Sequence, residues 1–97
     1  MYARVFSGQL QPGKLAEATR LVQESIIPVA RQQQGFKDLL WFIDRNTGKG
    51  MIVSLWATEA DRTASETNGF LHEQLAKLAT VVVGQPTTER FEVGGQE

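Results

Sequence analysis

Two side chains in this sequence stand out as candidates for catalysis. His72 is the only histidine among the 97 residues, and its side chain titrates near neutral pH, so it is the best candidate for a general base. Arg4 lies in an apolar, strand-like segment, where a charge needs a partner or a ligand. Its fixed charge could stabilise negative charge on a substrate. The alternatives are an ordinary surface role for His72 and, for Arg4, a salt bridge with Asp38, Glu89 or Glu92.

A binding surface for a flat ligand is suggested by the end of the apolar segment at residues 51–56. Trp56 closes this segment, and a tryptophan there could stack on a ring inside a pocket. Ser54 and Ile52 share its face if the segment is a strand, because side chains alternate. We predict these three residues and Phe6 as substrate contacts. The alternative for Trp56 is a core aromatic that anchors the corner of the fold.

Composition excludes several classes of function. The chain has no cysteine and one histidine, which excludes disulfides, thiolate metal sites, a cysteine nucleophile and a multi-histidine metal site. We therefore predict no metal site in the chain. The formal net charge is -1 and there is no basic stripe, so a nucleic-acid partner is not expected. No apolar run approaches the roughly 20 residues of a membrane helix, and no secretory signal is recognisable; a cytoplasmic protein is expected.

The elements that would position these residues follow from turn chemistry and periodicity. Residues 35–56 read as a β-hairpin around a turn at 44–49 that contains Asn and Gly. Residues 2–9 and 87–93 alternate as strands, whereas two segments have helical periodicity: residues 14–34, with a kink expected at Pro28 near Glu24 to Ile27, and residues 58–83, interrupted at Asn68-Gly69. The order β-α-β-β-α-β predicts a single α+β domain over 1–97, ferredoxin-like, with two helices on one face of a four-stranded antiparallel sheet.

The predicted hairpin is apolar on both faces. Phe36, Leu40 and Phe42 point one way by alternation, and a second set that includes Leu39 and Trp41 points the other way. The helices can cover only one of these faces. A two-fold homodimer, sheet against sheet, is the simplest way to cover the other, and Trp41 is predicted as an aromatic of that interface.

Three segments resemble a known family. They are I-I-P-V-A-R-Q-Q-Q-G-F at Ile26 to Phe36, S-L-W-A-T-E-A-D at Ser54 to Asp61, and L-A-K-L-A at Leu75 to Ala79. In this order and spacing they are similar to the antibiotic biosynthesis monooxygenase-like family of dimeric α/β-barrel proteins. The resemblance implies a homodimer with a dimeric α/β barrel. It also implies relatives that include cofactor-free oxygenases of aromatic polyketides and quinols, heme-degrading enzymes and small-metabolite isomerases.

The resemblance turns the candidate residues into a hypothesis about function. The chain is expected to be a cofactor-independent monooxygenase of a small aromatic or quinol-type metabolite bound between sheet and helices. Trp56 would pack the ring, His72 would be the base and Arg4 would stabilise a phenolate. Aromatic-oxidising members are expected to carry an Asn on the strand of Trp56, where this chain has Ser54 and Ile52, and the Trp and Asn of the heme-degrading members are absent. A non-catalytic dimeric small-ligand-binding protein and an isomerase are the alternatives.

Overall fold

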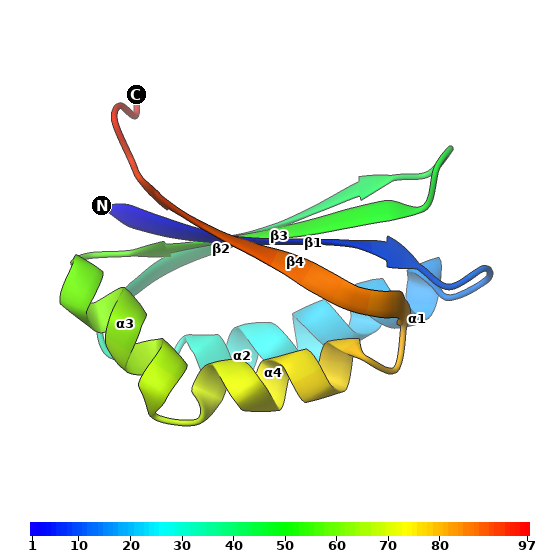
Figure 1. Ribbon diagram of the computed structural model, residues 1–97, viewed down its shortest axis with the longest axis horizontal. Coiled ribbons are helices and arrows are strands. Elements are labelled where there is room, and N and C mark those ends of the chain that lie inside the picture. Colours follow the sequence, from blue (N-terminus) through cyan, green and yellow to red (C-terminus); the bar gives the residue numbers. More distant parts are fainter.

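The computed structural model describes residues 1–97 as one antiparallel sheet with every helix on the same side (Figure 1). The strands are paired in the order β2-β3-β1-β4, so the predicted α+β, ferredoxin-like arrangement is confirmed. No helix combines the length and the apolar character that crossing a membrane requires. The elements in chain order are β1 (Tyr2–Leu10), α1 (Leu15–Leu21), η1 (Val22–Ile26), α2 (Ile27–Ala30), β2 (Phe36–Asp44), β3 (Lys49–Trp56), α3 (Glu59–Thr67), α4 (Phe70–Leu78) and β4 (Val82–Glu92).

The turn between β2 and β3 is held by one carboxylate. Asp44 accepts hydrogen bonds from the backbone N–H groups of Asn46, at 2.9 Å, and Thr47, at 3.3 Å, and these donors lower the pKa of the Asp44 carboxyl. Gly48 follows with φ of 77°, a conformation that glycine adopts without steric cost. The hairpin predicted from this turn is confirmed.

The first crossover is a continuous helical run rather than two helices. Its middle, η1, is a π-helical turn, and Pro28 lies at the start of α2 directly after it. Proline has no N–H to donate and its ring crowds the carbonyl four residues earlier, and prolines and π-turns are both recognised sites of irregularity in a helix. The kink expected near Glu24 to Ile27 is therefore a local π-turn that overlaps those residues.

The second crossover consists of two short helices joined at Asn68-Gly69. The hydroxyl of Thr58 caps α3 by accepting from the N–H of Asp61 at 3.0 Å. Between the helices, Gly69 has φ of 91°, and the Asn68 side chain accepts from the N–H of Phe70 at 3.0 Å. The interruption agrees with the sequence prediction.

One irregularity in β2 changes which side chains face the helices. The pairing of β2 with β3 shifts register between Phe36 and Asp38, as a bulge does when it adds one residue to a strand. Phe36 therefore lies on the helix side, where its ring meets Trp56 edge-on at a centroid distance of 5.7 Å. The prediction that Phe36 shares a face with Leu40 and Phe42 is wrong for this reason.

The remainder of β2 divides between a covered and an open face. Trp41 lies on the covered face, where its indole N–H donates to the Thr19 hydroxyl of α1 at 3.0 Å, so its predicted place in a sheet-to-sheet interface is wrong. The open face carries exposed Leu40, Phe42 and, from β4, Phe91. Asp38 is also exposed, and its carboxylate accepts from the N–H of Leu39.

Candidate functional site

The residues predicted to contact a substrate line one cavity between sheet and helices, which we call the inner slot. Its sheet side is formed by Arg4 and Phe6 of β1, Ile52, Ser54 and Trp56 of β3, and Leu39 of β2. Its helix side is formed by Ile26, Ala30, Phe70, Gln74 and Leu78. The strand alternation used in the sequence analysis placed the β1 and β3 residues correctly, because both strands keep their alternation through this region.

The inner slot is narrow. Its volume is about 20 Å³, room for about one water molecule, whereas sites for drug-sized molecules typically measure about 300–1,000 Å³. A second cavity of about 20 Å³ lies beside it and shares Phe6, Ile52 and Leu78 as walls. These three side chains fill the space between the two cavities. A ligand with an aromatic ring therefore needs a side chain or a helix of the slot to move.

Trp56 is held rigidly in the wall of the slot. It is fully buried, with Phe36 edge-on to its ring on one side and Phe70 at a centroid distance of 6.3 Å. Its indole N–H donates to the Ser54 hydroxyl at 3.0 Å, and that hydroxyl donates to the backbone carbonyl of Arg4 at 3.4 Å. The Ser54 hydroxyl is thus already engaged as both acceptor and donor.

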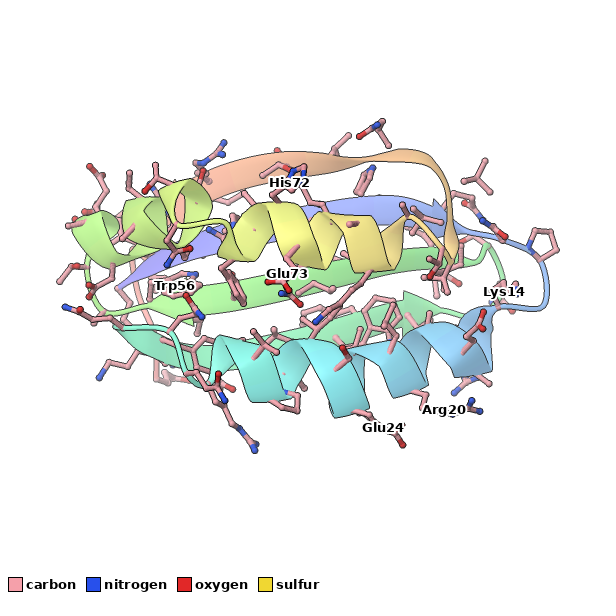
Figure 2. All side chains as sticks on the ribbon, turned by 90° about the horizontal axis from the view of Figure 1, so that it is seen from below. Lys14, Arg20, Glu24, Trp56, His72 and Glu73 are labelled. Carbon is pink, nitrogen blue, oxygen red and sulfur yellow. The ribbon has the colours of Figure 1, made fainter.

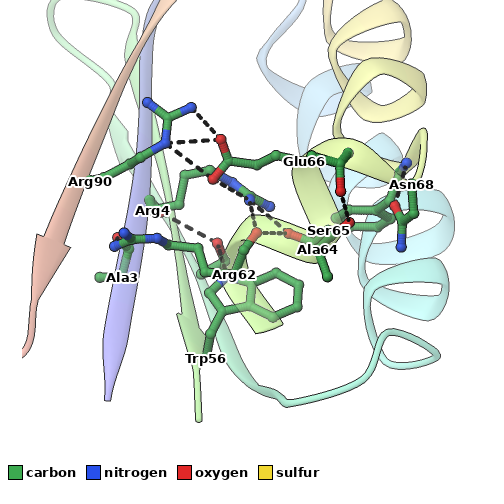
Figure 3. A network of polar contacts seen from close by, with 12 residues as sticks. Ala3, Arg4, Trp56, Arg62, Ala64, Ser65, Glu66, Asn68 and Arg90 are labelled. Carbon is green, nitrogen blue, oxygen red and sulfur yellow. Dashed lines mark hydrogen bonds and ion pairs between the residues drawn. The ribbon is translucent and has the colours of Figure 1, made fainter. Parts of the chain in front are cut away.

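Arg4 is a buried cation between the slot and α3 (Figure 3). Only 1% of it is exposed, and its guanidinium carbon lies 5.2 Å from the centroid of the Trp56 ring. Its Nη1 donates to the Ser65 hydroxyl at 2.8 Å and to the Arg62 carbonyl at 3.3 Å, and it pairs with Glu66 at 3.4 Å. Burial lowers the pKa of Arg4, and the charge of Glu66 opposes that shift. Its ionic partner is therefore Glu66, which the sequence analysis did not propose.

Glu66 joins two arginines from neighbouring strands. Nε of Arg90 in β4 donates to both carboxylate oxygens, at 2.9 and 3.1 Å, and its Nη2 contacts the same carboxylate. This hydrogen bonding is the main cause that lowers the pKa of Glu66, and Arg4 contributes less. The same contact raises the pKa of Arg90. The carboxylate thereby fastens α3 to β1 and β4.

Two donors at the slot have no partner within the chain. They are Nε of Arg4 and Nε2 of Gln74, and Gln74 is only 2% exposed. A buried polar group without a hydrogen bond costs roughly 1–3 kcal/mol. The sequence analysis did not single out Gln74, a polar residue in an otherwise apolar helical segment. The row at a spacing of four, Phe70, Gln74 and Leu78, is the one that is buried.

His72 does not reach the inner slot. It is exposed on α4, is absent from the slot lining, and lies on the side of α4 that faces β4 (Figure 2). The lining contains no carboxylate and no histidine, so it offers no side chain that accepts a proton near neutral pH. No cluster of three or more potential metal ligands is present.

Comparison with known proteins identifies the fold. No family model and no curated protein matches the sequence. Among solved structures, a monooxygenase from Streptomyces coelicolor in complex with nanaomycin D has a TM-score of 0.82 at 13% identity, covering 99% of this chain and 89% of that one. A candidate antibiotic biosynthesis monooxygenase from Deinococcus radiodurans has a TM-score of 0.74 at 19% identity, covering 100% of this chain and 96% of that one.

Not every similar structure has an assigned activity. A protein of unknown function from Nitrosomonas europaea has a TM-score of 0.78 at 20% identity and covers 99% of this chain and 91% of its own. At such identities the likeness concerns the arrangement of the backbone, because one fold serves many activities. The resemblance noted in the sequence is thus confirmed for the fold: this chain has the fold of the antibiotic biosynthesis monooxygenases.

Proposed function

We propose that this protein is a monooxygenase of the antibiotic biosynthesis type that oxidises a small electron-rich phenol or quinol in the inner slot without a cofactor. The observation that carries the proposal is the buried guanidinium of Arg4 beside the ring of Trp56. A flat apolar surface and a fixed cation are together complementary to a phenolate, because the surface packs against the ring while the cation stabilises its oxygen. The predicted contacts Phe6, Ile52 and Ser54 complete the wall.

The chemistry balances without an external reductant. With 1-naphthol as the example, the phenolate carbon para to the oxygen bonds to dioxygen, and the resulting hydroperoxide loses water to give 1,4-naphthoquinone. One oxygen atom enters the product, the other leaves as water, and the substrate supplies all the electrons. Arg4 would favour the ionised phenol, as an adjacent cation favours any acid's charged form. Because the slot lining offers no base, the proton would pass to solvent.

Entry of a ring would use the side of the slot at Phe70. This side chain lines the inner slot and also a hollow outside it, formed with Val29, Gln33, Asn68 and Glu73. A hydrogen bond of 3.1 Å from Asn68 to Gln33 closes the rim of the hollow. Rotation of Phe70 away from Trp56 would join the hollow to the slot.

We also propose that two copies associate through the open face of the sheet. Leu40, Phe42 and Phe91 are each more than two-fifths exposed there, and large apolar side chains gathered on one face mark an interaction surface. A two-fold arrangement would place each patch against the same patch of the other copy. The helices would remain outside, so both inner slots would stay accessible from the Phe70 side.

A non-catalytic dimer that binds a small ligand is the second candidate. The volume of the inner slot, about 20 Å³, favours it. Side chains of the protein fill most of the space that a catalytic pocket would keep open for its substrate. The lack of a base in the lining points the same way. This candidate predicts binding of a ligand without oxidation.

Oxidation of 1-naphthol separates the two candidates. The protein, dialysed against EDTA, is incubated with 1-naphthol and isotopically labelled dioxygen, and the quinone is analysed by mass spectrometry. One labelled oxygen in 1,4-naphthoquinone is the expected result. Arg4→Gln should lower the rate at least about tenfold, since it removes the charge, while Arg45→Gln in the exposed hairpin turn should not. Binding of 1-naphthol without quinone formation would overturn the oxygenase and leave the binding protein.

A further inference from the structure

We infer that Arg4 and Gln74 are a pair of donors that selects ligands by an acceptor oxygen, with Gln74 as a specificity-determining residue. The proposal names a carbonyl or phenolate oxygen on a flat ring system as the group recognised. It rests on the proposed function in one respect, namely that the inner slot is where the ligand binds. It does not depend on whether the ligand is oxidised.

The contact with Lys77 determines which end of the Gln74 amide lacks a hydrogen-bond partner. Nζ of Lys77 lies 3.1 Å from Oε1 of Gln74. An ammonium group has donors and no acceptor, so it can hold only the carbonyl oxygen of the amide. The NH2 end, Nε2, is therefore left over, and it is buried without a partner in the chain.

The remaining polar groups of the slot do not contact these donors. Ser54 already accepts from the Trp56 indole and donates to the Arg4 carbonyl. The contacts of Arg4 with Ser65, Arg62 and Glu66 are all made by Nη1, which leaves Nε without a partner. The polar groups left free in the lining are thus donors, one from the sheet side and one from the helix side.

Because the unpartnered groups of the slot are donors, a matching ligand must carry an acceptor. A carbonyl or phenolate oxygen accepts hydrogen bonds and would relieve one or both buried donors, whereas a hydrocarbon would leave them without partners. An amine or another cation would face the charge of Arg4 and would be disfavoured. Quinones and phenolates fit the pair, and the rings of Trp56 and Phe6 would accommodate their apolar faces.

Binding of shape-matched probes tests the pair directly. The probes are 1,4-naphthoquinone and naphthalene, measured by NMR on the 15N-labelled full chain. We expect the quinone to shift the Nε–H signal of Arg4, the NH2 signals of Gln74 and the indole N–H signal of Trp56. Naphthalene should bind more weakly and shift the Trp56 signal without the donor signals.

Substitution of Gln74 supplies the second measurement. Gln74→Met keeps the length of the side chain and removes the donor, so affinity for the quinone should fall about tenfold, as expected for one lost hydrogen bond, with naphthalene affinity not reduced. Gln23→Met, at an exposed helical position, is the matched control and should change neither affinity. Both titrations use protein whose thermal unfolding has been checked.

The possible failures are distinguishable. Equal affinity for both probes, or a Gln74→Met variant that binds the quinone as the wild type does, would overturn the donor pair while the slot remains the ligand site. If neither probe shifts the Trp56 signal, or shifts occur only elsewhere, the slot is not the ligand site and both this inference and the proposed function are overturned.

Discussion

The indole N–H of Trp56 donates to the hydroxyl of Ser54, two residues earlier on the same face of β3. Ser54 in turn donates to the Arg4 carbonyl. One hydroxyl of β3 therefore contacts both the aromatic wall of the slot and the backbone of β1. Ser54 is one of the two positions, with Ile52, at which the resemblance led us to look for an Asn. In this chain the position serves to hold the Trp56 ring in place.

Ser54→Ala is expected to destabilise the protein. The substitution leaves the buried Trp56 indole N–H without an acceptor, which costs roughly 1–3 kcal/mol. The free energy of unfolding from urea titration measures the loss, and the indole N–H signal of Trp56 should move in the NMR spectrum. Ser25→Ala, at a partly exposed helical position, is the control and should change stability by less than about 0.5 kcal/mol. An unchanged Trp56 signal would argue against this hydrogen bond.

Glu66→Gln is expected to flatten the acid side of the stability profile. The pKa of Glu66 is lowered in the folded state, chiefly by its hydrogen bonds to Arg90. The unfolded state therefore binds more protons in acid, and the free energy of unfolding decreases as the pH falls below about 4.3, the ordinary value for glutamate, and through the lowered pKa.

The measurement for Glu66 is the free energy of unfolding between about pH 2 and pH 7. Glu66→Gln should be less stable than the wild type at pH 7 and should lose less on acidification. Glu73→Gln, which removes an exposed carboxylate on α4, serves as the control and should keep the slope of the wild type. Parallel profiles for wild type and Glu66→Gln would contradict the role of the ion pairs.

His72→Ala tests the residue that the sequence favoured as base. Its side chain is exposed and outside the slot lining, so we expect turnover of 1-naphthol within about twofold of the wild type, as general-base loss typically costs about 100-fold or more. The pH profile of turnover should also be unchanged. A decrease in turnover of about 100-fold or more in a folded His72→Ala variant would show that His72 is the base after all.

Phe42→Asp is expected to disrupt the proposed dimer. Phe42 is 49% exposed on the open face, and two copies related by a two-fold axis would bring two carboxylates into an apolar interface. Sedimentation velocity at micromolar concentration should show a dimer for the wild type and a monomer for the variant. Thr63→Asp, at an exposed position on α3, should remain dimeric. A wild type that sediments as a monomer would remove the dimer from the proposal.

The fold could be predicted because its signals are local. The turn at Asp44 to Gly48 carries its own hydrogen-bonding side chain, Thr58 caps the helix that follows it, and helical and strand periodicities alternate clearly. Each of these features acts within a few residues, so each is visible in the sequence without knowledge of tertiary contacts.

The features that were missed depend on one-residue shifts or on distant partners. The bulge after Phe36 adds one residue to a strand, and strict alternation cannot reveal it, so Phe36 was placed on the wrong face. Alternation separated Trp41 from Phe42 correctly, but it does not say which of the two faces the helices cover, so Trp41 was assigned to the interface. Gln74 was missed because helical periodicity follows apolar residues, and a buried amide among them carries no signal of its own. The pairing of Arg4 with Glu66, 62 positions later, follows only once α3 lies against β1.

The sharing of Glu66 between two arginines also has an electrostatic consequence. Arg4 and Arg90 carry two positive charges against the single negative charge of that carboxylate, which leaves positive charge in excess beside the mainly apolar lining of the slot. An anion entering the slot would neutralise that excess. The network that fastens α3 to the sheet would then be strengthened by the ligand itself, so occupancy of the slot and resistance to unfolding should rise together.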